Sequence, residues 1–168
     1  MSKFLFVIPP LMGHINPTLG IGQKLIERNH EVAWTGIMEI PPSEFPQKGK
    51  FFLQESKELT DLMEGLKDKN LVSGLESVQF VFEDFFIPLG KNMFPQTLRV
   101  IDLYKPDVIV NDMQTFAGAC GAYVRGIPYV TSVTNATAGA EVIAGMTKVI
   151  EWEQNLVLSL QKELGITI

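Results

Sequence analysis

Two residues that lie far apart in the sequence, His14 and Asp112, each follow an apolar run of the kind found in buried strands. Phe4–Ile8 precedes His14, and Val108–Val110 precedes Asp112. Continuous apolar runs suit parallel strands that are covered on both faces. A carboxylate that accepts a hydrogen bond from one imidazole nitrogen stabilises the imidazolium formed when the other nitrogen takes a proton. Together, the two side chains would form a general base.

The chemistry of this pair depends on where the nucleophile comes from. The sequence holds no G-x-S-x-G elbow, and its one cysteine, Cys120, falls inside a predicted helix. The pair would therefore activate a hydroxyl group on a bound substrate. Structural alternatives stay open for both residues: the His14 ring can hydrogen-bond its own loop, and the Asp112 carboxylate can cap the helix that follows it.

The segment around His14 predicts a strand, a loop and a helix. Pro9-Pro10 ends the strand, because proline lacks the N–H that a central ladder uses. Asn16 followed by Pro17 is typical of a helix start. This signal predicts a helix over Pro17–Asn29 and leaves His14 in the loop before it, at the edge of the sheet where ligands bind in open α/β folds.

Two glycines interrupt the predicted first helix. Gly20 and Gly22 each cost about 1 kcal/mol relative to alanine in a helix interior, so we expect close approach of the helix to the sheet or to a ligand. The glycines do not form a G-x-G-x-x-G pattern, which excludes a nicotinamide-type fingerprint. Glu31–Gly36 reads as the next strand, completing a right-handed βαβ unit.

Alternating strand and helix signals continue along the chain. We expect a charged surface loop over residues 54–70 with at most one helical turn. A helical region over Val72–Tyr104 is predicted to break near Pro88, Gly90 and Pro95. The other predicted elements are the strands Phe51–Leu53, Val108–Val110 and Pro128–Val133 and the helices Phe116–Val124 and Met146–Leu164, with Gly126 and Gly165 as helix ends.

This alternation predicts an α/β fold with a Rossmann-like, doubly wound parallel sheet. In the common strand order 3-2-1-4-5, the first strand lies beside the fourth at the topological switch point. Adjacent strands are about 4.8 Å apart, so the His14 and Asp112 side chains would meet there.

Composition narrows the class of protein. A chain of 168 residues with 46% hydrophobic and 20% charged residues fits one ordinary globular domain. Its formal net charge of −5 argues against a nucleic-acid partner. One cysteine excludes an intramolecular disulfide and a cysteine-cluster metal site. No apolar run reaches the roughly 18–20 residues that cross a bilayer, so we expect a cytoplasmic protein without stable membrane insertion.

Three segments resemble the N-terminal, acceptor-binding domain of family-one nucleotide-sugar glycosyltransferases, among them the bacterial macrolide- and zeaxanthin-glycosylating enzymes. The similarity is weakest over residues 37–104, where the family varies. The matching segments are Phe6–Pro17, which contains the Gly-His-x-x-Pro loop, Lys105–Asp112 together with Gly126–Val130, and the helix end Leu160–Gly165.

The resemblance implies half of a two-domain GT-B enzyme that moves a hexose from a nucleotide sugar with inversion and without a metal or other cofactor. The expected donor is a UDP-sugar. The residue matching His14 is the base, and the one matching Asp112 balances its charge. Gly13 would lie in the donor-phosphate loop, at a helix start that favours an anion.

The implied acceptor is a small, apolar molecule with a hydroxyl group. Aromatic and methionine side chains of residues 78–94, Met12 at the first loop and the polar residues after the fifth strand are its candidate contacts. These acceptor candidates are Met12, Phe82, Phe85, Phe86, Met93, Thr134 and Asn135.

The chain ends at Ile168, so residues 1–168 are expected to form the acceptor domain alone, with the C-terminal nucleotide-sugar domain as a missing partner. We expect no sugar transfer from the isolated chain. One alternative is a non-catalytic GT-B-like binding or accessory module, which would not need His14 and Asp112 in contact. A sugar-nucleotide epimerase, a further alternative, would require more charged residues near the first loop.

Overall fold

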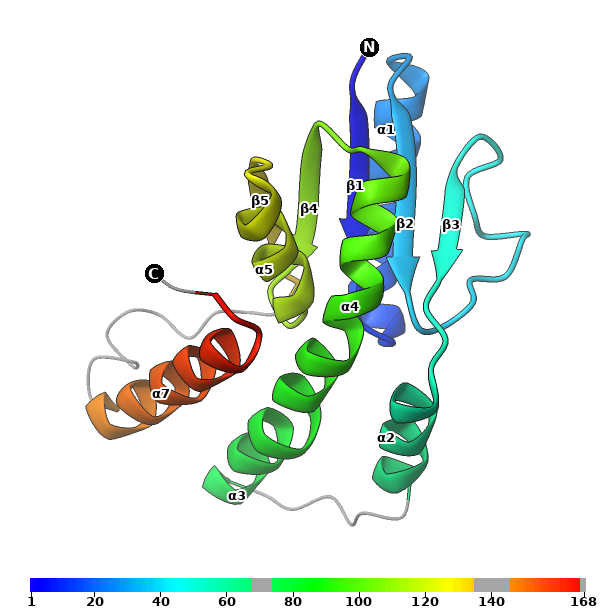
Figure 1. The fold of residues 1–168 in the computed structure, drawn as a ribbon. Coiled ribbons are helices and arrows are strands. Elements are labelled where there is room, and N and C mark those ends of the chain that lie inside the picture. The colour runs from blue at the N-terminus through cyan, green and yellow to red at the C-terminus, as the bar shows by residue number, and fades with distance from the viewer. Residues whose placement is uncertain (68–73, 135–145, 167–168) are drawn as a thin grey trace.

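The computed structural model describes residues 1–67, 74–134 and 146–166 as a five-stranded parallel sheet covered by helices (Figure 1). The strand order is β3-β2-β1-β4-β5, as the sequence predicts. The elements are β1 (Lys3–Val7), α1 (Met12–Glu27), β2 (Glu31–Gly36), β3 (Lys50–Leu53), α2 (Lys57–Lys67), α3 (Leu75–Gln79), the π-helix η1 (Phe80–Phe86), α4 (Ile87–Tyr104), β4 (Val108–Asp112), α5 (Phe116–Arg125), β5 (Tyr129–Ser132) and α7 (Thr147–Glu163).

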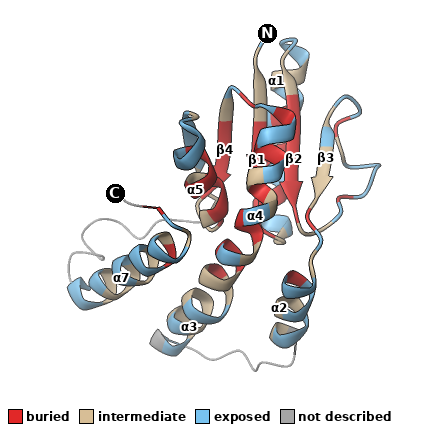
Figure 2. Cartoon of the chain, in the orientation of Figure 1, coloured by how far each residue is buried: buried red, intermediate tan, exposed pale blue. Residues whose placement is uncertain are grey.

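Two hydrophobic clusters lie on opposite faces of the sheet. Leu5 and Val7 of β1 belong to a cluster with α4 and α5, while Phe6 between them belongs to a second cluster with α1. This division follows from the period of two along a strand. Helix α1 covers the back of the sheet in Figure 1 and α4 the front. The buried residues concentrate in β1, β2 and β4 and on the inner sides of these helices (Figure 2).

The glycines of α1 differ in what surrounds them. An added Cβ at Gly22 would lie 2.1 Å from a ring carbon of Trp34 on β2, so close helix–sheet approach explains this glycine. The same construction at Gly20 meets no heavy atom within 4 Å. The expectation of a close contact therefore holds for Gly22 and is wrong for Gly20.

Helix α1 begins five residues earlier than the sequence predicts. Its first residue is Met12, and the capping position is Leu11, which makes no side-chain cap. Asn16 and Pro17 lie inside the helix, so the predicted helix start at this pair is wrong. Pro17 lies beyond the first turn and removes one intrahelical hydrogen bond, and the buried side chains of Ile15 and Leu19 hold the helix against the sheet despite this loss.

The segment predicted as a surface loop contains helix α2. The Ser56 hydroxyl accepts a hydrogen bond from the N–H of Leu59 at 3.2 Å, which caps the helix start. Leu59 is 3% exposed and joins the main core, and Leu62 packs against that core. Serine before residues with helical apolar spacing was the signal for this helix, and the abundance of charged residues masked it.

The helical region before β4 is unbroken from α3 through η1 to α4 over its described residues. Pro88 lies in the first turn of α4, directly after the π-helix, and Pro95 lies inside α4. The predicted breaks at Pro88, Gly90 and Pro95 are therefore wrong. Buried side chains of α4, including Leu89, Met93 and Ile101, hold the helix against the sheet despite the lost proline N–H. Val72 lies outside the described residues.

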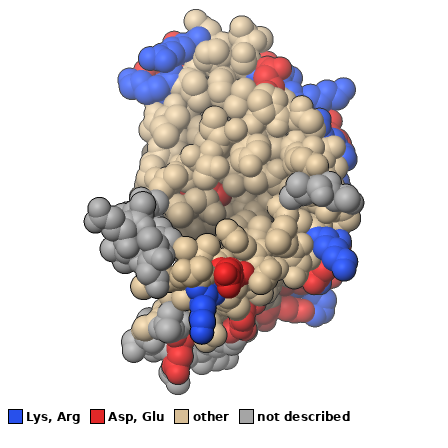
Figure 3. Space-filling model, turned by 90° about the vertical axis from the view of Figure 1, so that its left-hand side faces the viewer, with Lys and Arg blue, Asp and Glu red and all other residues tan. Residues whose placement is uncertain are grey.

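Strand β5 is the least buried strand of the sheet. It pairs with β4 alone among the described strands. Tyr129, Val130 and Val133 are each about half exposed, and Tyr123 and Val124 of α5 are exposed as well. The corresponding side of the molecule has a broad area that carries few charged side chains (Figure 3). An apolar, uncharged edge of the sheet therefore faces outward.

Tyr104, at the end of α4, gives the fold a pH dependence that can be measured. The side chain is buried, and its hydroxyl has no hydrogen-bond partner in the part of the chain that the structure describes. Burial raises the pKa of Tyr104 from 10.0 to about 12, with Glu31 and Asp107 adding to the effect. The folded state therefore keeps this proton at pH values where the unfolded chain loses it. Stability from this group is complete below pH 10.0 and is lost as pH rises towards about 12.

We expect the variant Tyr104→Phe to lose part of this pH dependence. At neutral pH its free energy of unfolding should match that of the original protein or exceed it slightly, because an unpartnered buried hydroxyl is removed. Between about pH 10 and about pH 11, stability should fall less steeply than in the original protein. Urea unfolding at each pH measures both effects. Equal slopes for the two proteins would contradict the assignment.

Candidate active site

His14 lies in the first turn of α1, the helix that follows β1 after a short connection. Its side chain is 9% exposed. Because α1 starts at Met12, the ring is fixed by helical backbone rather than by a loop. The backbone N–H of His14 donates to the carbonyl of Leu11 at 2.9 Å. Because α1 starts early, the backbone of His14 is held more rigidly than in the loop that the sequence predicts.

The Nδ1 atom of His14 contacts the carboxylate of Asp112. Both carboxylate oxygens lie 3.1 Å from Nδ1, and the Asp112 side chain is fully buried at the end of β4. An ionised carboxylate only accepts hydrogen bonds, so Nδ1 carries the proton and donates it. Among the described residues no hydrogen bond occupies Nε2, which leaves its lone pair available. The two side chains predicted to meet at the switch point do meet.

The remaining contacts of Asp112 show that its side chain does not cap the helix that follows it. Its Oδ1 accepts the backbone N–H of Gln114 at 2.9 Å, and its Oδ2 accepts the hydroxyl of Thr134 at 3.0 Å. The capping residue of α5 is Thr115, and no side-chain bond caps that helix. The interpretation of Asp112 as a helix cap is therefore wrong: its carboxylate faces His14 and Thr134.

The predicted acceptor contacts fall into different environments. Met12 is exposed at the start of α1 and lies on the same turn as His14. Phe86 is 6% exposed, Phe85 packs against the main core, and Met93 in that core is completely buried. Phe86 and Met93 therefore offer little surface to a ligand, whereas Phe85 is only partly buried. Asn135 lies outside the described residues.

Phe82 lines an open apolar hollow of about 510 Å³ between the long helical region and α7. Met113 and Phe116, at the start of α5, also line this hollow. Because Met113 directly follows Asp112, the hollow lies next in the chain to the His14–Asp112 contact. The other lining residues are Glu153, Gln154, Val157, Leu158 and Gln161 of α7. Burial raises the pKa of the Glu153 carboxyl above its usual value.

The α7 side of this hollow was missed from the sequence. Val157 and Leu158 belong to a helix whose apolar residues read as ordinary core positions. The position of Met113 and Phe116 directly after the predicted aspartate was a usable signal, because side chains that follow the same strand end share one edge of the sheet.

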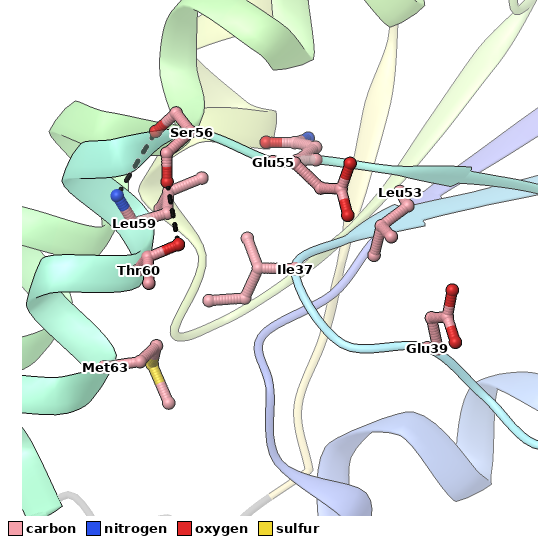
Figure 4. A pocket seen from close by; sticks show the side chains of 9 residues that line it. Ile37, Glu39, Leu53, Glu55, Ser56, Leu59, Thr60 and Met63 are labelled. Atoms are coloured by element: carbon pink, nitrogen blue, oxygen red, sulfur yellow. Dashed lines mark hydrogen bonds between the residues drawn. The ribbon is translucent and has the colours of Figure 1, made fainter.

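A second cavity, of about 330 Å³, opens beyond β2 and β3 (Figure 4). The carboxylates of Glu39 and Glu55 line it, together with apolar side chains such as Ile37 and Met63. In Figure 4 the side chains of Ser56 and Thr60 lie on the α2 side of this space. The sequence does not predict this cavity, because one of its walls is helix α2, which lies in the segment predicted as a loop.

The described residues contain neither a metal-binding cluster nor a membrane-spanning helix. No group of three or more histidine, cysteine, aspartate or glutamate side chains there is placed to hold a metal ion. No helix in that part of the chain is long and apolar enough to cross a membrane.

No protein-family model matches the chain. It is similar to 4'-demethylrebeccamycin synthase from Lentzea aerocolonigenes, with 25% identity over 140 residues, which cover 76% of this chain and 31% of that protein. The chain thus spans about a third of this curated relative. The sequence comparison agrees with the resemblance to glycosyltransferases found in the sequence.

Solved glycosyltransferase structures share the fold. CalG4, the calicheamicin glycosyltransferase, matches with a TM-score of 0.73 and 16% identity over 99% of this chain and 43% of its own. SsfS6 from Streptomyces sp. SF2575 matches with a TM-score of 0.69 and 16% identity over 99% of this chain and 47% of its own. SsfS6 complexed with thymidine diphosphate also matches, with a TM-score of 0.65. The resemblance to glycosyltransferases is confirmed, and the chain has the α/β fold of part of a GT-B enzyme.

Proposed function

We propose that residues 1–168 form the acceptor-binding half of an inverting glycosyltransferase. The reaction moves a hexose from a nucleotide sugar, a UDP-sugar in the first instance, to a hydroxyl group of an apolar small molecule. The observation that carries this proposal is the contact of His14 Nδ1 with the buried Asp112 carboxylate, which leaves Nε2 without a hydrogen bond among the described residues. A binding module without catalysis would not need this arrangement.

In the proposed reaction the acceptor hydroxyl donates a hydrogen bond to Nε2 of His14. As the acceptor oxygen forms its bond to the anomeric carbon, Nε2 takes the hydroxyl proton and the bond from that carbon to the phosphate oxygen breaks. The nucleoside diphosphate leaves with the bonding electrons. Asp112 stabilises the imidazolium that results.

The start of α1 would serve the leaving group. The first N–H groups of a helix lack intrahelical partners and attract an anion. A Cβ added at Gly13, next to His14, would meet no heavy atom within 4 Å, so the space above this turn is open. The diphosphate could then lie beside the base. Most of the contacts to the nucleotide would come from a donor-binding partner domain, as in enzymes of about twice this length.

The apolar hollow beside Met113 is the proposed place for the body of the acceptor. Its walls are apolar, and Glu153, Gln154 and Gln161 supply a few polar groups at one side, which is the usual composition of a small-molecule site. Trp152 is a built-in reporter, because its ring contacts Phe82 at a centroid distance of 5.8 Å. The other tryptophan, Trp34, is completely buried in the second core cluster.

We expect a flavonol to quench Trp152 fluorescence and the variant Leu158→Glu to weaken its binding about tenfold, or about 1.4 kcal/mol. Leu158 is 55% exposed and lines the hollow, so the new charge enters the site without disturbing the core. Leu103→Glu is the matched control, because Leu103 is 72% exposed on α4 and does not line the hollow. Equal affinity in both variants would place the acceptor elsewhere.

A further inference from the structure

Thr134 joins His14 and Asp112 in one cluster. Its Oγ1 lies 2.5 Å from Nδ1 of His14 and 3.0 Å from Oδ2 of Asp112. The three residues follow or end three strands that are neighbours in the sheet, β1, β4 and β5. The sequence suggests Thr134 as an acceptor contact, and in the structure its hydroxyl faces the two polar side chains.

The direction of each hydrogen bond follows from the groups involved. The Asp112 carboxylate can only accept, so the single hydroxyl proton of Thr134 goes to Oδ2. The oxygen of Thr134 then turns a lone pair towards Nδ1 of His14, which must carry a proton to interact with it. The Nδ1 proton is thus held by the Asp112 carboxylate and the Thr134 hydroxyl together.

We propose that Thr134 is a positioning residue for the base: it fixes the Asp112 carboxylate and keeps His14 in the tautomer with a free Nε2. This inference rests on the proposed function of His14. Oδ1 of Asp112 is already held by the backbone N–H of Gln114, and Thr134 holds the other oxygen. With both oxygens held, the carboxylate cannot rotate away from the imidazole.

His30, the second of the two histidines in the chain, is an internal reference. Its Nδ1 accepts the backbone N–H of Ser2 at 3.1 Å, so in the neutral ring the proton lies on Nε2. The structure therefore assigns opposite tautomers to the two rings. Two-bond proton–nitrogen spectra of the ¹⁵N-labelled chain distinguish these tautomers directly and require no sugar transfer.

The test compares the full chain with Thr134→Val and Thr134→Ser. We expect His14 in the original protein and in Thr134→Ser to show the Nδ1–H tautomer, and Thr134→Val to show a clear loss of it. The His30 signals should stay unchanged in all three proteins, which reports intact folding. An unchanged His14 tautomer in Thr134→Val, with His30 intact, would overturn the positioning role.

Flavonol binding separates this role from direct contact with the acceptor. A positioning residue leaves affinity, measured by Trp152 fluorescence, within about twofold in Thr134→Val, whereas an acceptor contact would weaken it about tenfold. Weakened binding with an unchanged tautomer would replace the proposal by an acceptor role. The proposed function fails by a different result, which is full sugar transfer by an enzyme whose His14 has been replaced. The failure of the positioning role and the failure of the proposed function are therefore distinguishable.

Discussion

Replacing His14 with alanine is expected to lower sugar transfer by about 10²- to 10⁴-fold, which is the usual contribution of a general base. The reason is that Nε2 is the acceptor for the hydroxyl proton, and no other described side chain of the cluster offers an unprotonated nitrogen. The protein for this test joins residues 1–168 to the nucleotide-sugar-binding half of a glycosyltransferase. The rate of transfer is measured as release of the nucleoside diphosphate, with a flavonol as acceptor and a UDP-sugar as donor.

Two further variants separate loss of the base from loss of the fold. His14→Gln keeps an N–H donor that can reach the Asp112 carboxylate and has no basic nitrogen, so it should be as inactive as His14→Ala while retaining more stability. His30→Ala removes the other histidine, which accepts the N–H of Ser2 at the opposite end of β1, and should keep full activity. Full transfer by folded His14→Gln would rule out His14 as the base.

Gly22→Ala is expected to lower the free energy of unfolding by about 2 kcal/mol. The new methyl group would lie 2.1 and 2.3 Å from two ring carbons of Trp34. That ring is stacked on Phe6 at 5.1 Å and its Nε1 donates to Thr18 at 3.0 Å, so it has little freedom to move. Overpacking costs about 1–3 kcal/mol or more, and the better helix propensity of alanine returns about 1 kcal/mol.

Gly20→Ala is the matched control on the same helix. Gly20 is exposed and its added methyl group meets nothing within 4 Å, so only the propensity gain of about 1 kcal/mol remains. Urea unfolding followed by tryptophan fluorescence should therefore show shifts of opposite sign for the two variants. A stabilised Gly22→Ala would mean that Trp34 can leave its present position at little cost.

The sheet and the His14–Asp112 contact were predictable from the sequence because both depend on chain order. Strands at regular intervals fix a parallel topology, and the topology places the ends of β1 and β4 side by side. The polar residues after those ends then meet whatever the details of the helices. This is why an error of five residues at the start of α1 did not affect the contact.

The contacts of Thr134 and the exposure of the aromatic residues were not predictable in this way. Thr134 differs from an ordinary loop threonine only in where its hydroxyl points, which depends on the path of the chain after β5. Phe82 and Met93 read alike as apolar positions, yet one lines a hollow and the other is completely buried. Periodicity reports which face is apolar and does not report how much of that face a neighbouring helix covers.

The outward-facing edge of β5 favours self-association of this chain, and this limits the protein concentration suitable for measurements. Among the described strands β5 pairs with β4 alone, so its other edge, with half-exposed Tyr129, Val130 and Val133, is a template for another strand. Because few charged side chains lie on that side, the net charge of −5 does little to keep two chains apart there. Self-association should therefore grow with protein concentration and respond weakly to salt, and tautomer and affinity measurements belong at the dilute end of their range.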